Sequence, residues 1–182
     1  MIKRLEHLRP DLHFVVTATS RARRPNEVHG VDYHFVSKEQ FEEWIARDQL
    51  LEHAVVYGEY KGIPRQQVLD ALDRGTDVVL RIDVQGAATM RRLLPGVVSI
   101  FIAAETEAEL VQRLLSRKTE TMDRMAVRVE TARQEMQRAV DFDYIVVNRD
   151  GQLDETARQL GSIIDAAKLQ AARRLPSNVA AN

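Results

Sequence analysis

Three nearly continuous apolar runs lie along the chain, at residues 77–83, 97–104 and 144–148. Strands buried on both faces carry runs of this kind, because neither side of such a strand meets water. Between these runs, apolar residues recur at every third or fourth position, which predicts helices with one buried face. Strands that alternate with helices in this way are typical of an α/β fold with a parallel sheet.

Capping signals help to locate the helices. Ser37 and Gln40 have the spacing of a capping box, in which side chains bind free backbone N–H groups at the start of a helix. Thr106 and Glu109 repeat this spacing. The predicted helices are residues 2–8, a segment after Ser37, and residues 65–74, 87–94, 107–116, 122–140 and 153–174.

The first third of the chain differs in character from the rest. Residues of about 16–66 carry shorter strands that look more antiparallel, at 33–36 and 50–57, and we expect them to form a small lobe. The helical, arginine-rich stretch of about 107–138 is expected to form a lid. The prediction is one domain, 1–182, whose core is about 1–15, 67–106 and 139–175, with a disordered tail at 176–182.

Composition argues against several kinds of partner and metal site. Apolar residues make up 45% of the 182 residues, and the net charge of −1 argues against nucleic-acid partners, which bind basic surfaces. No apolar run reaches the roughly 20 residues of a membrane span. The chain has no cysteine, which excludes disulfides and thiolate metal sites. We therefore expect a cytoplasmic protein that binds neither nucleic acid nor membranes.

A first candidate cluster follows a β-rich segment at 12–19, and consists of Arg21, Arg23 and Arg24 with Tyr33 a few residues on. Guanidinium groups bind phosphate oxygens through paired hydrogen bonds, and a phenol adds one more donor. The alternative is a solvated basic loop, which is the commoner fate of an isolated basic run.

Glu52 and Asp83, at the ends of two apolar runs, form a second candidate cluster. Ligands of α/β folds bind at the carboxyl ends of parallel strands. A carboxylate at such a place can accept the N–H donors of a base such as guanine. The alternative for each residue is to cap a helix or to pair with a nearby arginine.

Arg113, Arg117 and Arg128 form a third candidate cluster. Arg113 and Arg117 are four residues apart and therefore share one helix face. Three arginines that converge from two helices can neutralise a phosphoryl group during its transfer. An ion pair between Glu109 and Arg113 is the alternative, with equal weight.

Five segments together resemble the guanylate kinase family, in its order and spacing, from about Phe14 to Ala167. They are TATSRARRPNEVHGVDYHFVS, LLEHAVVYGEYKGIPR, VVLRIDVQGA, RLLSRKTET and FDYIVVN. The resemblance implies the three-layer α/β core of P-loop kinases with a GMP-binding lobe and a helical lid. It also implies transfer of a phosphoryl group from ATP to GMP, with Mg²⁺ as cofactor, in purine nucleotide metabolism.

The resemblance implies a role for each residue that binds GMP. Arg21, Arg24 and Tyr33 resemble the clamp on the GMP phosphate. Glu52 and Asp83 resemble the carboxylates that read guanine.

The resemblance implies roles for further positions, with two departures from the family, at Lys61 and Ile63. Thr17 lies where a hydroxyl contacts the base, and Lys61 stands where the family has a second phosphate-binding tyrosine. Ile63 replaces a hydroxyl residue that donates to guanine. The third cluster resembles the lid and transfer arginines, and Asn148 lies in the region that contacts the adenine of ATP.

The family begins with a strand and a glycine-rich loop that cradles the ATP phosphates. Residues 2–8 resemble the helix that follows this loop. We therefore expect the chain to be truncated at its N-terminus, with the first central strand and the loop missing, and to show little phosphoryl transfer by itself.

Two other functions stay open at this point. A catalytically inactive guanylate kinase-like module would bind GMP or a phosphopeptide in the same lobe. A kinase of AMP or of a pyrimidine monophosphate would make poor use of Glu52 and Asp83. GMP and ATP are the expected partners, and we expect a monomer or a homodimer.

Overall fold

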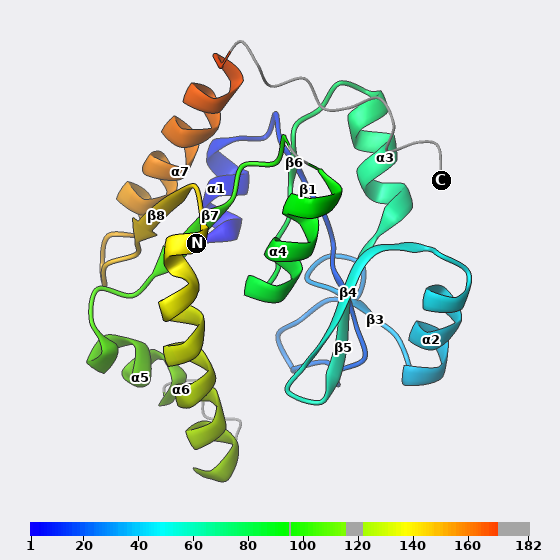
Figure 1. Cartoon of the computed structure of the whole chain (residues 1–182), viewed down its shortest axis with the longest axis horizontal. Helices are drawn as coiled ribbons and strands as arrows, with labels where there is room; N and C mark the ends of the chain where they lie inside the picture. Colours follow the sequence, from blue (N-terminus) through cyan, green and yellow to red (C-terminus); the bar gives the residue numbers. More distant parts are fainter. Residues whose placement is uncertain (95, 116–121, 171–182) are drawn as a thin grey trace. The chain divides into compact units, whose positions relative to one another are not determined.

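The computed structural model describes residues 1–94, 96–115 and 122–170, which fall into two compact units (Figure 1). One unit comprises residues 9–96, and the other comprises residues 1–8 together with the described residues from 97 onward. The division into core, lobe and lid stays a prediction. The predicted tail at 176–182 lies outside the described residues.

Four strands organise the 9–96 unit: β2 (Ala18–Thr19), β3 (His34–Phe35), β4 (Leu50–Val56) and β5 (Glu59–Pro64). They form one sheet in the order β3-β2-β5-β4, in which β5 is antiparallel to both of its neighbours. Tyr57 and Gly58 join β4 to β5 with φ values of 55° and 76°, the left-handed backbone of a two-residue hairpin turn. The predicted strands at 33–36 and 50–57 are confirmed.

Helix α2 (Lys38–Ala46) packs on this sheet. It begins at the predicted cap, where the Oγ of Ser37 accepts a hydrogen bond from the backbone N–H of Gln40 at 3.1 Å. Phe41 of α2 is fully buried and stacks on Tyr60 of β5, with the ring centres 5.0 Å apart. This aromatic pair anchors the hairpin that carries part of the candidate site.

Two short strands, β1 (His13–Phe14) and β6 (Val78–Val79), pair in parallel in the same unit. Helix α3 (Arg65–Asp73) follows β5, and helix α4 (Val84–Leu93) follows β6. The strands expected at 12–19 and 77–83 are shorter than predicted, because a strand needs a hydrogen-bonded neighbour and only part of each run has one. The rest of the second run carries the chain from β6 to α4.

In the other unit, β7 (Ile100–Ala103) and β8 (Tyr144–Val147) pair in parallel along their whole length. Helix α1 (Ile2–Leu8) packs against helix α7 (Leu153–Lys168), and Leu5 and Leu160 are buried there. The predicted mixed α/β architecture with parallel strand pairing is therefore confirmed.

Two further helices of this unit, α5 (Glu107–Leu115) and α6 (Met122–Gln137), contact each other. Helix α5 has the predicted cap, since the backbone N–H of Glu109 donates to the Oγ1 of Thr106 at 3.1 Å. The last turn expected of the helix at 122–140 is a 3-10 turn, Arg138–Asp141. Helix α7 confirms the last predicted helix as far as Lys168.

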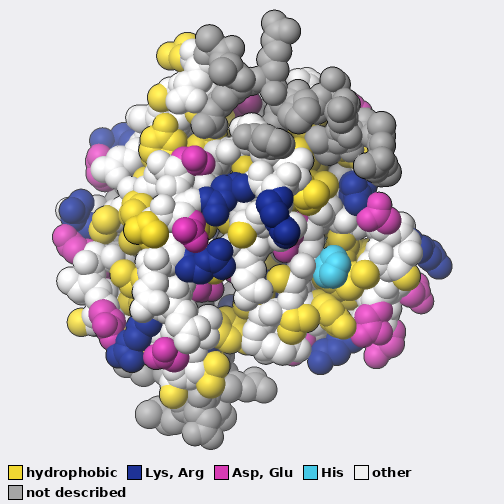
Figure 2. Space-filling view, in the orientation of Figure 1, with side chains coloured by type: hydrophobic (Ala, Val, Ile, Leu, Met, Phe, Trp, Pro, Cys, Tyr) yellow, Lys and Arg dark blue, Asp and Glu magenta, His cyan; other side chains and the backbone are white. Residues whose placement is uncertain are grey.

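The surface carries both signs of charge. Lys and Arg side chains are interspersed with Asp and Glu side chains on the face drawn in Figure 2, as the net charge of −1 leads one to expect. Among the described helices, none is both long and apolar enough to cross a membrane.

Candidate functional site

The two carboxylates of the second candidate cluster meet in the 9–96 unit. Glu52 lies on β4 with its side chain almost entirely buried, and Asp83 is the N-cap of α4. The Oδ1 of Asp83 accepts hydrogen bonds from the backbone N–H groups of Gln85 at 2.9 Å and Gly86 at 2.8 Å. Asp83 is thus a helix cap, as the alternative interpretation expected, and this cap starts α4 three residues earlier than the predicted Ala87.

Gly86 lets the Glu52 carboxylate approach the first turn of α4. A Cβ atom at this position would lie 3.1 Å from one carboxylate oxygen of Glu52 and 3.2 Å from the other. That is closer than ordinary van der Waals contact, so the absence of a side chain makes room for the carboxylate. Glu52 and Asp83 therefore sit at the same helix N-terminus.

The electrostatic environment makes Glu52 an unusual acid. Burial, and in addition the negative charge of Asp83, raise the pKa of Glu52 to about 7. No residue in the described part of the chain donates a hydrogen bond to its carboxylate. Glu52 is therefore a buried acceptor that a ligand with N–H donors would satisfy.

Strand register places Thr17 and Glu52 on either side of Ile63 in β5. Glu52 of β4 pairs directly with Ile63. On the opposite edge of β5, Ala18 pairs with Gly62, so the preceding residue, Thr17, lies opposite Ile63. Side chains directly opposite one another in a sheet point to the same face. Thr17 is only 3% exposed, and its Oγ1 has no hydrogen-bond partner among the described residues.

The row Thr17–Ile63–Glu52 thus has an apolar centre between two unsatisfied polar ends. Ile63 is completely buried, and its side chain has no hydrogen-bond donor. Lys61 is two residues earlier on β5 and shares the face of Ile63, about 7 Å along the strand.

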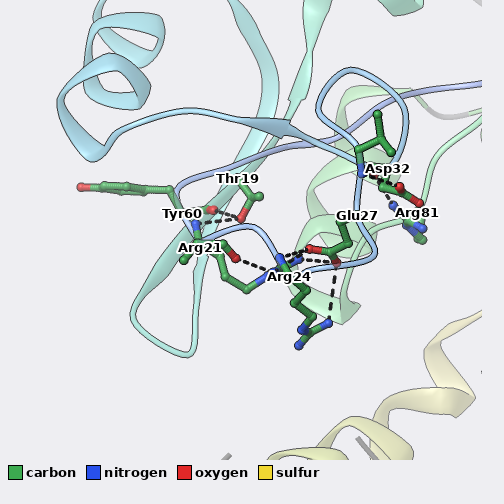
Figure 3. A network of polar contacts seen from close by, with 9 residues as sticks. Thr19, Arg21, Arg24, Glu27, Asp32, Tyr60 and Arg81 are labelled. Atoms are coloured by element: carbon green, nitrogen blue, oxygen red, sulfur yellow. Dashed lines mark hydrogen bonds and ion pairs between the residues drawn. The ribbon is translucent and has the colours of Figure 1, made fainter. Parts of the chain in front are cut away.

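The first candidate cluster forms a polar network on the loop after β2 (Figure 3). The guanidinium of Arg21 binds both carboxylate oxygens of Glu27, at 2.8 and 3.0 Å. The backbone N–H of Arg24 also donates to Glu27, at 2.9 Å, and the Arg24 guanidinium lies 3.8 Å from it. Arg23 is exposed.

Glu27 occupies the donors that an anionic ligand would use. Burial alone would raise the pKa of Glu27, but hydrogen bonds from Arg21 and from the Arg24 backbone, together with both charges, lower it overall. Sequence reasoning missed this residue. The available signal was an acid three residues after Arg24 in an otherwise basic loop.

Arg81 is a second residue that sequence reasoning missed. It donates to the backbone oxygen of Asp32 at 3.1 Å, and its guanidinium lies 4.7 Å from the centre of the Tyr33 ring (Figure 3 shows the Asp32 contact). The Arg21 guanidinium lies 5.4 Å from the same ring. Tyr33 thus joins the predicted arginine cluster to a cation from the segment that leads to Asp83.

The remaining predicted residues belong to the other unit. Arg113 of α5 forms the ion pair with Glu109 that the alternative interpretation expected, and it also donates to the backbone oxygen of Asn148 at 2.6 Å. The Oδ1 of Asn148 accepts a hydrogen bond from the hydroxyl of Thr156 at 3.1 Å. Arg128 is half-buried on α6, and Arg117 lies outside the described residues.

The chain is similar to several known guanylate kinases. The family model described as Guanylate kinase matches residues 2–167. "Guanylate kinase 2, chloroplastic/mitochondrial" of Oryza sativa subsp. japonica is 55% identical over 175 residues, 96% of this chain. A guanylate kinase of Methylococcus capsulatus is 41% identical over 92% of this chain and 81% of its own length. The crystal structure of guanylate kinase from Anaplasma phagocytophilum matches with a TM-score of 0.79 at 30% identity, over 97% of this chain and 84% of that protein.

The extent of these matches differs between relatives. The chain spans 61% of the length of the rice protein, whereas it spans most of the bacterial one. The family model reaches from α1 to the end of α7 and includes the segments that carry Glu52, Asp83 and the arginine loop. The chain belongs to the guanylate kinase family.

Proposed function

We propose that this chain is a guanylate kinase that binds GMP through its 9–96 unit and phosphorylates it with ATP. The products are ADP and GDP. The observation that carries the proposal is the Glu52 carboxylate, which is buried beside Asp83 and receives no hydrogen bond from the described residues. Guanine offers adjacent N1–H and N2–H₂ donors, which match such an acceptor.

The same acceptor discriminates against adenine. Adenine presents a lone pair at N1 where guanine presents an N–H, so it would leave the buried carboxylate unsatisfied. A site built to accept a hydrogen bond rejects analogues that cannot donate it, because its own buried group is then unpaired. Thr17 supplies a hydroxyl at the other end of the row over Ile63.

The phosphate of GMP is assigned to Arg21, Arg24, Tyr33 and Lys61. Lys61 lies on the face of the sheet that carries Ile63, and the loop of Arg21 and Arg24 follows β2 directly. In the free protein the Arg21 guanidinium donates to the Glu27 carboxylate, so a phosphate would compete with Glu27 for these donors. Phosphate carries more negative charge than a carboxylate at neutral pH, which favours the exchange.

Phosphoryl transfer requires positioning and charge neutralisation rather than a covalent intermediate. We assign the neutralising role to Arg113, Arg117 and Arg128, and contact with the adenine of ATP to the region of Asn148. These assignments rest on the match of the segments RLLSRKTET and FDYIVVN to the family. On binding ATP, Arg113 would exchange its present partners, Glu109 and the backbone of Asn148, for phosphate oxygens.

Mg²⁺ is the proposed cofactor. Across the described residues, no group of three or more His, Cys, Asp and Glu side chains is arranged to hold a metal ion. We assign the ion to the ATP phosphates, where Mg²⁺ keeps several waters and usually needs few protein ligands. Bound there, it would offset negative charge on the transferred group.

Nucleotide selectivity tests the GMP assignment. Wild-type protein titrated calorimetrically should bind GMP at least about tenfold more tightly than AMP, and Glu52→Gln should reduce that ratio by weakening GMP alone. Glu6→Gln makes the same charge change at an exposed position of α1 and is the matched control. Equal losses for both nucleotides in Glu52→Gln would contradict the base-reading role.

Release of ADP from MgATP tests the transfer step. The proposal predicts that ADP forms only when GMP is present, and that it forms faster when the family's first strand and glycine-rich loop are joined ahead of residue 1. Selective GMP binding without ADP formation in that longer chain would contradict the enzyme and support the inactive GMP-binding module instead.

Cellular location and assembly are part of the proposal. We place the protein in the cytoplasm, because a chain without cysteine has no need of an oxidising compartment. The rice relative is named for chloroplast and mitochondrion, so fractionation of cells that express the native gene must distinguish cytosol from organelle. Sedimentation equilibrium would separate the expected monomer or homodimer from larger assemblies.

A further inference from the structure

Arg21 uses three of its five N–H donors within the free protein. Its two terminal nitrogens donate to Glu27 and to the backbone oxygen of Ala22, at distances from 2.7 to 3.0 Å. The charge of Arg21 is therefore balanced by Glu27. A phosphate must therefore displace Glu27 from Arg21 or bind other cationic side chains nearby.

Arg81 is held in place without being neutralised. Its one hydrogen bond goes to the backbone oxygen of Asp32, which carries no net charge. The carboxylate of Asp32 accepts from the backbone N–H of Val28 instead. No described acidic side chain lies within ion-pair distance of Arg81, and four of its five N–H donors are unused.

Arg81 contacts Tyr33, one of the residues to which the GMP phosphate is assigned. The Arg81 guanidinium is the closer of two arginines to this ring, at 4.7 Å against 5.4 Å for Arg21. A guanidinium over an aromatic ring is stabilised by the ring while its N–H edges stay available. Arg81 also precedes Asp83 by two residues, so one short segment carries a cation and a carboxylate that lies beside Glu52.

We propose that Arg81 is an additional phosphate-binding residue for GMP, whose guanidinium donates to a phosphate oxygen while the Asp32 backbone and the Tyr33 ring hold it in position. This inference rests on the proposed GMP function. It adds a residue to those assigned by resemblance to the family. The charge of Arg21 is balanced by Glu27. No described carboxylate balances the charge of Arg81.

The test compares a nucleotide with its nucleoside. Arg81→Gln should weaken GMP binding by about tenfold or more, the scale of a hydrogen bond to a charged group, and leave guanosine binding unchanged. Arg74→Gln removes the same charge at an exposed position at the end of α3 and should change neither affinity. Arg81→Lys should restore part of the GMP affinity, because it restores the charge but not the planar fork.

A double-mutant cycle of GMP affinity shows whether Arg81 contacts the phosphate itself or only orients Tyr33. If Arg81 acted only by orienting the phenol, Arg81→Gln would have no further effect in a Tyr33→Phe background. The proposal predicts that the loss of GMP affinity persists there. A vanished effect, or a GMP affinity unchanged by Arg81→Gln alone, overturns the proposal. A wild-type chain that prefers guanosine and GMP no more than their adenine analogues overturns the proposed function instead.

Discussion

Glu52 and Thr17 are polar side chains that the 9–96 unit buries without a hydrogen-bond partner from the described residues. A buried polar group left unpaired costs about 1–3 kcal/mol, and more if it is charged. The two residues flank Ile63 in one row of the sheet, so a single ligand can satisfy both. At these positions, we expect substitutions to have opposite effects on folding and on ligand binding.

Guanosine affinity should depend on pH through Glu52. The ionised carboxylate accepts the guanine N–H donors, and the pKa of Glu52 in the free protein is about 7. Below that pH the acid must lose its proton when guanosine binds, so affinity should fall by up to about tenfold per pH unit and level off above it. Calorimetry between about pH 5.5 and 8.5 measures this dependence, and guanosine avoids the phosphate ionisation near pH 6.

Glu52→Gln is the control for that titration. Its amide cannot ionise, so guanosine should bind more weakly and with no dependence on pH over the same range. A wild-type profile as flat as that of the variant would show that Glu52 does not contact the base.

Thr17→Val should separate stability from binding. Valine has nearly the shape of threonine but removes a hydroxyl that lacks a partner, so the free energy of unfolding should stay equal or rise by up to about 1 kcal/mol. GMP affinity should fall, because the base loses a polar contact. Urea denaturation and calorimetry measure the two effects.

Thr19→Val is the matched comparison on the same segment. The Thr19 hydroxyl donates to the backbone oxygen of Tyr60 at 3.0 Å and accepts from the backbone of Arg21. Its removal should destabilise the protein by about 1 kcal/mol or more, since two buried bonds are lost. If Thr17→Val destabilised the chain as much as Thr19→Val, the Thr17 hydroxyl would have a structural partner and the assignment to the base would fail.

At the scale of elements, the β4–β5 hairpin packs against α2 and carries Glu52 to the first turn of α4. Both capping boxes in the sequence predicted helix starts that the structure confirms, because a cap is a local interaction between near neighbours. Strand lengths were less predictable. The run at 77–83 is apolar throughout, but only Val78 and Val79 find a parallel neighbour in β1.

Gly62 is the position where this packing is tightest. A Cβ atom there would lie 2.9 Å from the Cζ of Phe41 and 3.0 Å from the backbone oxygen of Glu52. Gly62→Ala should therefore destabilise the protein by about 1–3 kcal/mol, the usual cost of overpacking. The measurement is the free energy of unfolding in urea. The cost should shrink in a Phe41→Leu background, which removes the nearer atom, and an equal cost in both backgrounds would contradict this origin.

At the scale of the whole molecule, Glu52 and Asp83 meet as the sequence led us to expect, but for a different reason. Glu52 lies near the start of β4, which pairs antiparallel with β5, and not at the carboxyl end of a parallel strand. Its contact with the first turn of α4 brings it to Asp83. Their roles in reading the base stay predictions. Arg81 and Glu27 were not predicted, because their contacts depend on the path of a loop that carries no periodic pattern. For Arg113, the sequence left two interpretations, and the free protein shows the ion pair with Glu109.

The central claim is that the 9–96 unit binds GMP and that Glu52 recognises the guanine base. A crystal structure of this chain with GMP is its most direct test. The account predicts guanine at the row Thr17–Ile63–Glu52, with its N1–H and N2–H₂ donating to the Glu52 carboxylate. It places the phosphate against Arg24 and Tyr33, within hydrogen-bond reach of Arg81. GMP bound outside residues 9–96, or bound there with its base turned away from Glu52, would contradict the account.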